Sequence, residues 1–132
     1  MADAGKDLAD DLQIAVLAMV QVSRAVSKSD DKRPTVNDLK DSGSIENAAD
    51  MVVLCYRDAY YAQREREPDA INKAVEWGIW NDRCNSKELE LIIGKVRESF
   101  GVGSVKLWAD MGFNAVRERA PERRHGLLDG ID

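Results

Sequence analysis

Three groups of polar residues in this sequence carry side chains whose chemistry suits contact with phosphate. Gln21 follows an apolar run and stands near Arg24. A side-chain amide can donate a hydrogen bond to a phosphate oxygen and accept one from a water molecule. Lys95 and Arg97 follow another apolar stretch, and two residues apart on a strand they would share one face. From spacing alone a simpler interpretation is favoured, in which both groups are the polar ends of ordinary strands.

The third group consists of Lys40, Asp41 and Gly43. Binding to a nucleic-acid backbone needs a cation together with backbone N–H groups that phosphate can approach closely, and glycine permits that approach. Contacts of this kind read no base sequence. The same residues also fit a helix that ends at a glycine, and the two interpretations are geometrically compatible.

Four apolar segments predict the strands that would position these groups. The segments are residues 14–20, 51–56, 89–93 and 105–109. The first is apolar throughout, which is typical of a strand buried on both faces of an α/β sheet and paired along both edges. The last two are separated by a turn containing Gly101 and Gly103, which predicts a hairpin.

Short helices are expected between these strands. Residues 2–12 predict one helix, because their apolar side chains recur on one face. Residues 35–40 predict another, with Asp38 at the capping-box position, and Gly43 is expected to end it. A further helix is expected after Asp69, whose carboxylate can cap it.

The composition is that of an ordinary soluble domain. The chain has 132 residues, of which 44% are hydrophobic and 33% charged, so wholesale disorder is not expected. The net charge of -5 argues against tight DNA binding by the chain alone. Between residues 24 and 40, however, five basic residues outnumber three acidic ones. Any contact with DNA should come from that segment.

Nothing in the sequence predicts export or a membrane. The amino terminus is acidic and has no apolar signal core, and the longest apolar run, residues 14–20, is too short to cross a bilayer. Cys55 and Cys84 do not have metal-binding spacing, so reduced thiols are expected. A cytoplasmic location is therefore expected.

A resemblance to a known family rests on segments that occur in a fixed order along the chain. They are residues 20–26 (VQVSRAV), 31–53 (DKRPTVNDLKDSGSIENAADMVV), 56–61 (YRDAYY) and 91–97 (LIIGKVR). Together they resemble the RecA-like carboxy-terminal ATPase domain of the DnaB family of replicative DNA helicases. The resemblance covers roughly residues 6 to 117 and is weaker across 61–87.

The resemblance implies an α/β fold with part of a RecA-like, P-loop NTPase-type sheet, about four core strands and short helices. Residues 1–117 would form this domain, with an insertion at about 60–87, and residues 118–132 a charged tail.

The resemblance also implies roles for the three polar groups. Gln21 would sense the γ-phosphate of ATP. Lys40, Asp41 and Gly43, with Arg24, would contact single-stranded DNA in the pore of a hexameric ring. Lys95 and Arg97 would reach across the subunit boundary to the ATP of a neighbouring helicase subunit, with Arg97 acting as an arginine finger. The side chains assigned to catalysis are thus Gln21, Lys95 and Arg97.

One motif of such ATPases does not occur in these 132 residues. No GxxxxGK[ST] sequence is present, and the resemblance implies that the phosphate cradle and the Mg²⁺-holding Asp lie upstream of residue 1. We therefore expect no ATP hydrolysis by this chain alone, and ATP and Mg²⁺ only within a complete subunit or ring, assembled as a homo-hexamer or with a complementing chain. Two alternatives remain open: a non-catalytic module that binds or inhibits an intact helicase, and a degenerate prophage remnant.

Overall fold

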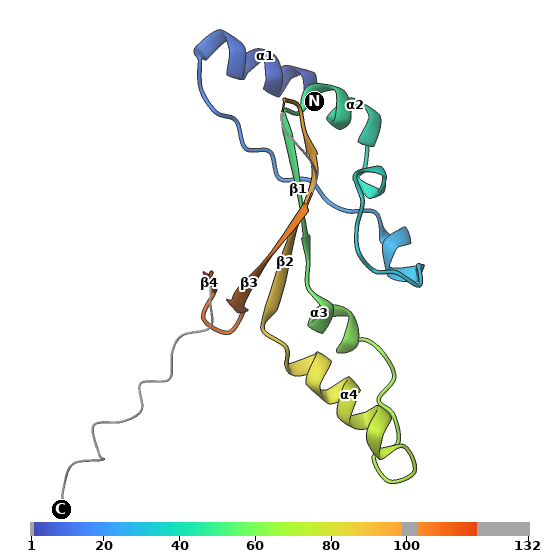
Figure 1. Ribbon diagram of the computed structural model, residues 1–132. Helices are drawn as coiled ribbons and strands as arrows, with labels where there is room; N and C mark the ends of the chain where they lie inside the picture. The colour runs from blue at the N-terminus through green and yellow to red at the C-terminus, as the bar shows by residue number, and fades with distance from the viewer. Residues whose placement is uncertain (1, 99–102, 119–132) are drawn as a thin grey trace, which may run out of the picture.

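A four-stranded antiparallel sheet lies at the centre of the computed structural model, which describes residues 2–98 and 103–118 (Figure 1). The strands are β1 (Met51–Tyr56), β2 (Glu88–Val96), β3 (Gly103–Asp110) and β4 (Ala115–Arg117), adjacent in that order. The predicted strands at 51–56, 89–93 and 105–109 are confirmed. The predicted hairpin is also confirmed, because β2 and β3 pair antiparallel with Leu91 opposite Val105.

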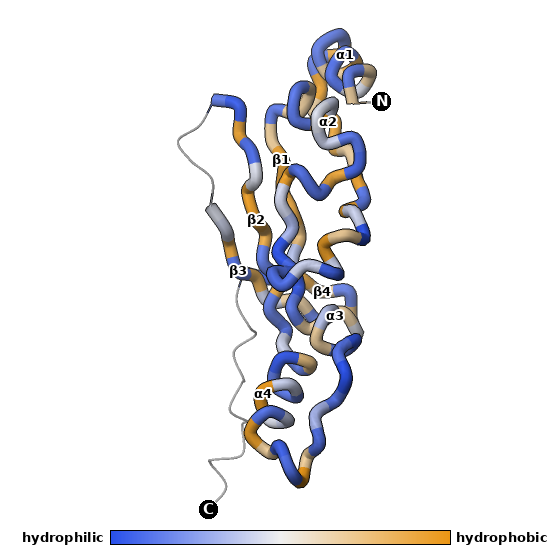
Figure 2. The backbone as a smooth tube through the Cα atoms, turned by 90° about the vertical axis from the view of Figure 1, so that its right-hand side faces the viewer, coloured by the Kyte–Doolittle hydropathy of each residue, from blue (hydrophilic) through white to orange (hydrophobic). Residues whose placement is uncertain are grey.

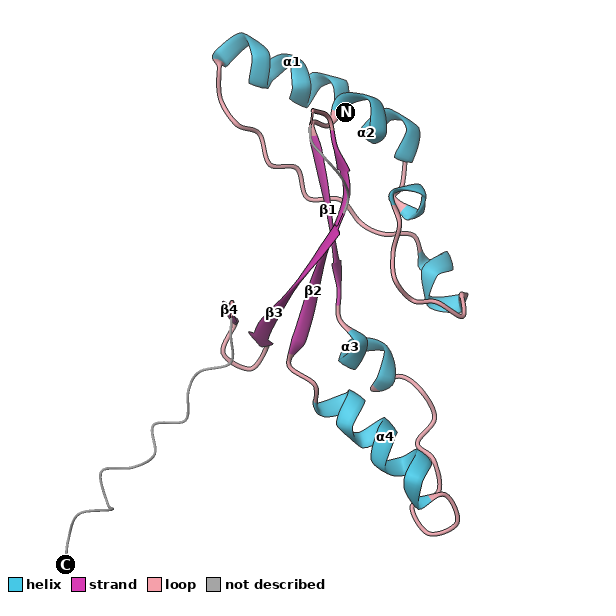
Figure 3. Ribbon diagram, in the orientation of Figure 1, coloured by secondary structure: helices cyan, strands magenta, loops and turns pink. Residues whose placement is uncertain are grey.

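Six short helices flank the sheet within the described part of the chain. They are α1 (Ala2–Leu12), the 3-10 helices η1 (Arg24–Lys28) and η2 (Val36–Asp38), α2 (Ser42–Ala48), α3 (Asp58–Ala62) and α4 (Ala74–Asn85). The elements α1 and α2 lie near one end of β1 and β2, and α3 and α4 lie at the other end (Figure 3). No helix among the described residues is both long and apolar enough to cross a bilayer.

The core is small and lies against one face of β1 and β2. Leu39, Val52 and Leu54 are buried together, and Val36 and Ile45 pack against them. Alternate residues of β1 point to opposite faces, so its side chains are buried and exposed in turn. Hydrophobic residues recur along β1 and β2 (Figure 2).

Gly94 allows η2 to approach β2 closely. A Cβ atom at this position would stand 2.7 Å from Cγ2 of Val36 and 3.2 Å from Cδ1 of Leu54. The first separation is shorter than real Cβ contacts and the second is tighter than most of them, so a side chain at position 94 would force Val36 and Leu54 to shift.

The predicted strand at residues 14–20 is wrong. This segment has no strand pairing and is exposed along its length, with Leu17 and Met19 each 90% exposed. A strand needs a neighbouring backbone that supplies hydrogen-bond partners. No described strand pairs with residues 14–20, and two residues further on Val22 forms an isolated antiparallel bridge with Leu39. The fourth strand of the sheet is instead β4, which the sequence did not indicate.

The helix predictions hold with different boundaries. Asp38 caps η2 as expected, because its carboxylate accepts hydrogen bonds from the backbone N–H and the hydroxyl of Thr35, both at 2.7 Å. The prediction that Gly43 ends a helix is wrong, since Gly43 lies inside α2. Asp41 precedes α2 with a φ of 59°, a left-handed conformation that aspartate tolerates better than most residues.

The predicted insertion at about 60–87 contains the end of α3 and all of α4. Asp69 caps a turn before α4, accepting hydrogen bonds from the backbone N–H groups of Ile71 and Asn72. Residues 119–132 of the predicted tail, and Gly101 of the predicted turn, lie outside the described residues.

Candidate functional site

Lys95 and Arg97 reach the same end of helix α2. The Nζ of Lys95 donates to the carbonyl oxygen of Glu46, and Nη2 of Arg97 donates to that of Asn47 at 2.6 Å. Carbonyl groups in the last turn of a helix have no N–H partner within the helix, and cations are favourable there. The two basic side chains therefore share one surface, as their spacing predicts.

Asp50 also contacts Arg97. Nη1 of Arg97 lies 3.2 Å from Oδ1 of Asp50, and the backbone N–H of Arg97 donates to the backbone oxygen of Asp50 at 2.8 Å. Nζ of Lys6, in α1, lies 3.0 Å from Oδ2 of Asp50. The hydrogen bond from Lys6, helped by the nearby charge of Arg97, holds the pKa of Asp50 below its usual range, although partial desolvation opposes this. The Arg97 side chain remains 41% exposed.

Gln21 and Lys40 are brought side by side through backbone pairing. The antiparallel bridge between Val22 and Leu39 places the residue before Val22 beside the residue after Leu39. The N–H of Ser23 also donates to the carbonyl oxygen of Asp38 at 2.7 Å, which continues the same register. The segment with Gln21 and the loop with Lys40 are therefore joined by backbone pairing.

The three polar groups thus meet around α2. Lys40 and Asp41 precede the helix, Gly43 lies in its first turn, and Lys95 and Arg97 bind the carbonyl groups of its last turn. Arg24 opens η1 and is exposed, as are Gln21, Lys40 and Asp41. No hydrogen bond between described residues joins Gln21 directly to Lys95 or Arg97, so α2 is what connects them.

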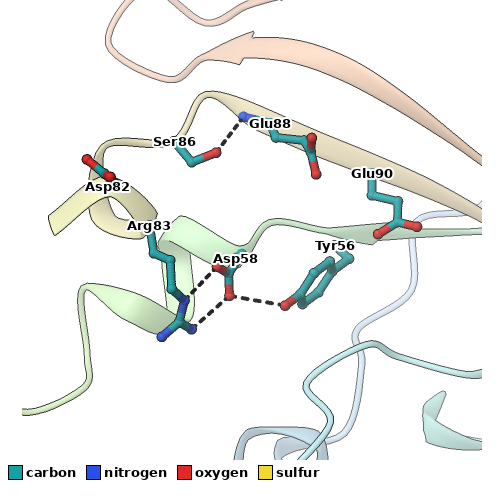
Figure 4. Close-up of a pocket in the computed structure, with 7 residues that line it drawn as sticks. All are labelled: Tyr56, Asp58, Asp82, Arg83, Ser86, Glu88 and Glu90. Atoms are coloured by element: carbon teal, nitrogen blue, oxygen red, sulfur yellow. Dashed lines mark hydrogen bonds and ion pairs between the residues drawn. The ribbon is translucent and has the colours of Figure 1, made fainter. Parts of the chain in front are cut away.

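A second polar region, which the sequence did not indicate, lies where the sheet meets α3 and α4 (Figure 4). It is a hollow of about 280 Å³ lined by Tyr56, Asp58, Asp82, Arg83, Ser86, Glu88 and Glu90. Arg83 donates to both carboxylate oxygens of Asp58, at 2.8 and 2.9 Å, and the Tyr56 hydroxyl donates to Asp58 at 3.2 Å. The hydrogen bonds from Arg83 lower the pKa of Asp58, and burial raises the pKa of Tyr56 to about 12.

Glu90 is the buried carboxylate of this region, with 5% of the residue exposed. It accepts hydrogen bonds from Nε and Nη2 of Arg33 at 3.0 and 2.7 Å. The Ser104 hydroxyl and then Arg33 hold its pKa below the usual range against the opposing effect of burial. The pair ties the loop between η1 and η2 to β2.

These contacts pair Asp58 with Arg83 and Glu90 with Arg33, and both pairs join separate elements. No group of three or more His, Cys, Asp or Glu in residues 2–98 and 103–118 has a geometry that could hold a metal ion. The hollow contains the Arg83–Asp58 ion pair, which joins α4 to α3, and the surface around α2 is the stronger candidate for function.

Comparison with known proteins identifies the family. The sequence model described as the DnaB-like helicase C terminal domain matches residues 1–117. The replicative DNA helicase DnaB of Rickettsia bellii is 41% identical over 113 residues, which are 83% of this chain and 22% of that protein. The replicative DNA helicase DnaB of Geobacillus stearothermophilus is 39% identical over 102 residues, which are 77% of this chain and 18% of that protein. The chain thus spans about a fifth of the length of these relatives.

Solved structures agree with the sequence comparison. A structure described as an ATPase domain superposes with a TM-score of 0.67 at 29% identity, over 88% of this chain and 34% of its own. A DnaB-like replicative helicase, solved to show its interactions with primase, superposes with a TM-score of 0.60 at 34% identity, over 81% of this chain and 21% of its own. The expected partial RecA-like α/β fold is confirmed. The chain belongs to the family of DnaB-like helicase C terminal domains.

Proposed function

We propose that this chain acts as the carboxy-terminal part of a replicative DNA helicase subunit in ATP-dependent DNA unwinding. Its relatives are replicative DNA helicases. The observation that carries the proposal is the convergence of three chemically suited groups on α2, from positions near 21, 40 and 95 in the sequence.

Lys95 and Arg97 would act on the ATP of a neighbouring subunit in a ring. A guanidinium keeps its charge and offers planar donors to the oxygens of a γ-phosphate, where it stabilises the charge of the transition state. Arg97 is held on one side by a neutral carbonyl oxygen, and its side chain is 41% exposed. A phosphate oxygen is a stronger acceptor than that carbonyl, so this contact can be exchanged when ATP is close.

Gln21 and the Lys40 loop would report on nucleotide and on DNA. The amide of Gln21 can bond to a γ-phosphate, and Lys40, Asp41 and Gly43 can follow a DNA backbone without reading bases. The pairing of Val22 with Leu39 supports a direct link between the two events, because a shift of either segment displaces the other. Arg24, in the same unit, would add positive charge along the strand of DNA.

The partners would be helicase subunits in a hexameric ring, formed with copies of this chain in complete subunits or with a complementing chain. The exposed apolar residues 14–20 support such an association, since a continuous apolar segment gains stability when a neighbouring strand and helices cover it. ATP and Mg²⁺ would be held by the complete subunit, and single-stranded DNA by the assembled ring.

Co-expression with a helicase segment that contains a P-loop tests the proposal. We expect the two chains to purify together and to hydrolyse ATP in a DNA-stimulated manner. Arg97→Ala should abolish that stimulation, whereas Arg66→Ala, at an exposed position outside the proposed site, should not change it. Absence of association, or equal activity in both variants, would overturn the proposal.

A second function is supported by the same exposed features. Because residues 14–20 and Arg97 are exposed, the chain could dock on an intact helicase and occupy the contact that a subunit normally makes. Titration of an intact replicative helicase with this chain separates the two functions. A dose-dependent loss of unwinding favours the docking module, and unchanged unwinding counts against it.

A further inference from the structure

The side chain of Asp50 lies where three separate elements meet. It precedes β1, its Oδ2 binds Lys6 of α1, and its Oδ1 binds Arg97 beyond the end of β2. Both oxygens of one carboxylate thus hold cations that are 91 positions apart in the chain, at Lys6 and Arg97. The packing of the three elements, and not the local sequence, therefore brings these side chains together.

Arg97 has three anchors on the segment that ends at Asp50. They are the backbone hydrogen bond to the oxygen of Asp50, the ion pair with its carboxylate and the hydrogen bond to the carbonyl of Asn47. The backbone bond fixes where the side chain starts. The hydrogen bond from Nη2 to Asn47 and the charge attraction between Nη1 and the Asp50 carboxylate then draw two nitrogens of the guanidinium toward this segment. Together they restrict its rotation more than one contact alone would.

We propose that Asp50 is a positioning residue that orients the guanidinium of Arg97. Its consequence for ATP hydrolysis rests on the proposed function, whereas the orientation itself does not. In this role Asp50 acts through Arg97 alone. A pre-oriented donor loses less freedom when it meets phosphate, which lowers the barrier in the assembled ring.

Lys6 shares the Asp50 carboxylate with Arg97. The carboxylate is shared, and its contact with Lys6 at 3.0 Å is shorter than its contact with Arg97 at 3.2 Å. Asp10 also binds Lys6, at 3.2 Å. Three cations, including Lys95, therefore lie near the Asp50 carboxylate, so Arg97 does not hold that carboxylate alone.

The intact chain with Asp50→Asn tests the orientation directly. The substitution keeps the shape of the side chain and the backbone bond from Arg97, but removes the charge. Asp10→Asn is the matched control, because it removes the other carboxylate of Lys6 without touching Arg97. Rotation of the Arg97 guanidinium is measured by nitrogen NMR of the 132-residue protein.

We expect the Arg97 guanidinium to rotate about two- to fivefold faster in Asp50→Asn, the change that loss of a partly exposed ion pair brings. Asp10→Asn should leave the rotation unchanged. Equal rotation in the wild type and in Asp50→Asn would overturn the proposal, whatever the activity of the ring.

The DNA-stimulated ATPase assay with a P-loop chain tests the consequence. Asp50→Asn should lower kcat about two- to fivefold with KM unchanged. In an Arg97→Ala background it should not lower the residual unstimulated ATPase rate, because a positioning residue acts only through the side chain that it orients. An equal loss in both backgrounds would overturn the positioning role. If Arg97→Ala itself leaves the ATPase unchanged, the proposed function fails, and the NMR result still decides the orientation.

Discussion

Replacing Arg33 by methionine should leave the buried carboxylate of Glu90 without its charged partner. Methionine keeps much of the apolar stem of Arg33 but removes both donors to Glu90, at 3.0 and 2.7 Å. The Glu90 side chain is only 7% exposed, so water cannot replace the lost partner freely. Its remaining neutral partner is the Ser104 hydroxyl.

The magnitude lies between two limits. Removing one member of a fully buried ion pair costs about 3–5 kcal/mol, and removing one member of an exposed pair costs about 0–1 kcal/mol. Glu90 matches the first case, but Arg33 is 51% exposed and its charge is partly screened. We therefore expect Arg33→Met to lower the free energy of unfolding by about 2 kcal/mol. At a typical urea m-value of about 1.5 kcal/mol per M, the midpoint falls by about 1 M.

Urea titration followed by tryptophan fluorescence measures this loss. Adding Glu90→Gln to Arg33→Met should recover about 1 kcal/mol of the free energy of unfolding, because the buried charge that has lost its partner is then removed. The Ser104 hydroxyl and Arg33 lower the folded-state pKa of Glu90, so their stabilisation is complete above its ordinary value of 4.5. It is lost as pH falls through the lower folded value. The urea midpoints of the wild type and of Arg33→Met should therefore begin to converge as the pH falls below about 4.5.

Two results would refute this reasoning. One is a midpoint shift for Arg33→Met of less than about 0.2 M, the size of an exposed substitution. The other is additivity, in which Glu90→Gln costs the same with and without Arg33. Either result would show that Arg33 does not stabilise the ionised form of Glu90.

Gly94→Ala should cost about 1–3 kcal/mol in urea titrations, because its Cβ would clash with the residues packed against β2. Gly78→Ala, with open space around it in the middle of α4, should instead stabilise the protein by about 0.5–1 kcal/mol. Leu54→Ala, at a residue 2% exposed, should cost about 3 kcal/mol, whereas Ile71→Ala, at a residue 89% exposed, should cost less than about 0.5 kcal/mol. Arg83→Met should speed amide hydrogen exchange in α3 and α4 about tenfold, since it removes about 1.4 kcal/mol of ion pairing between them.

Local patterns in the sequence predict much of this fold. The helix at Ala2–Leu12 follows from the periodicity of its apolar residues, and the strand at Met51–Tyr56 follows from its continuous apolar run. The segment at 14–20 has an equally clear pattern and yet forms no strand, because pairing depends on a second backbone that its own residues do not specify. The strand β4 has only three residues, too few for any periodicity to be detected.

The sequence names the residues of the candidate site but not the contacts that they make. Alternation along a strand places Lys95 and Arg97 on one face, and this much is local. Their attachment to α2 and to Asp50 joins positions about 50 residues apart, as the sequence separations of 49 and 50 for the two backbone contacts show. The Arg33–Glu90 pair spans 57 positions. Contacts of such separation are set by the packed fold, and no spacing rule in the sequence encodes them.

Helix α2 lies between Lys40 at its start and the pair Lys95 and Arg97 at its end, and this position restricts its length as well as its composition. Seven residues form a rod about 10 Å long, and each added or removed residue would turn one end about 100° relative to the other. An insertion that a surface loop would absorb would here swing Lys40 or the carbonyl of Asn47 to a different side of the molecule. Helical phase therefore constrains the interval from Lys40 to Asn47 independently of which side chains it carries.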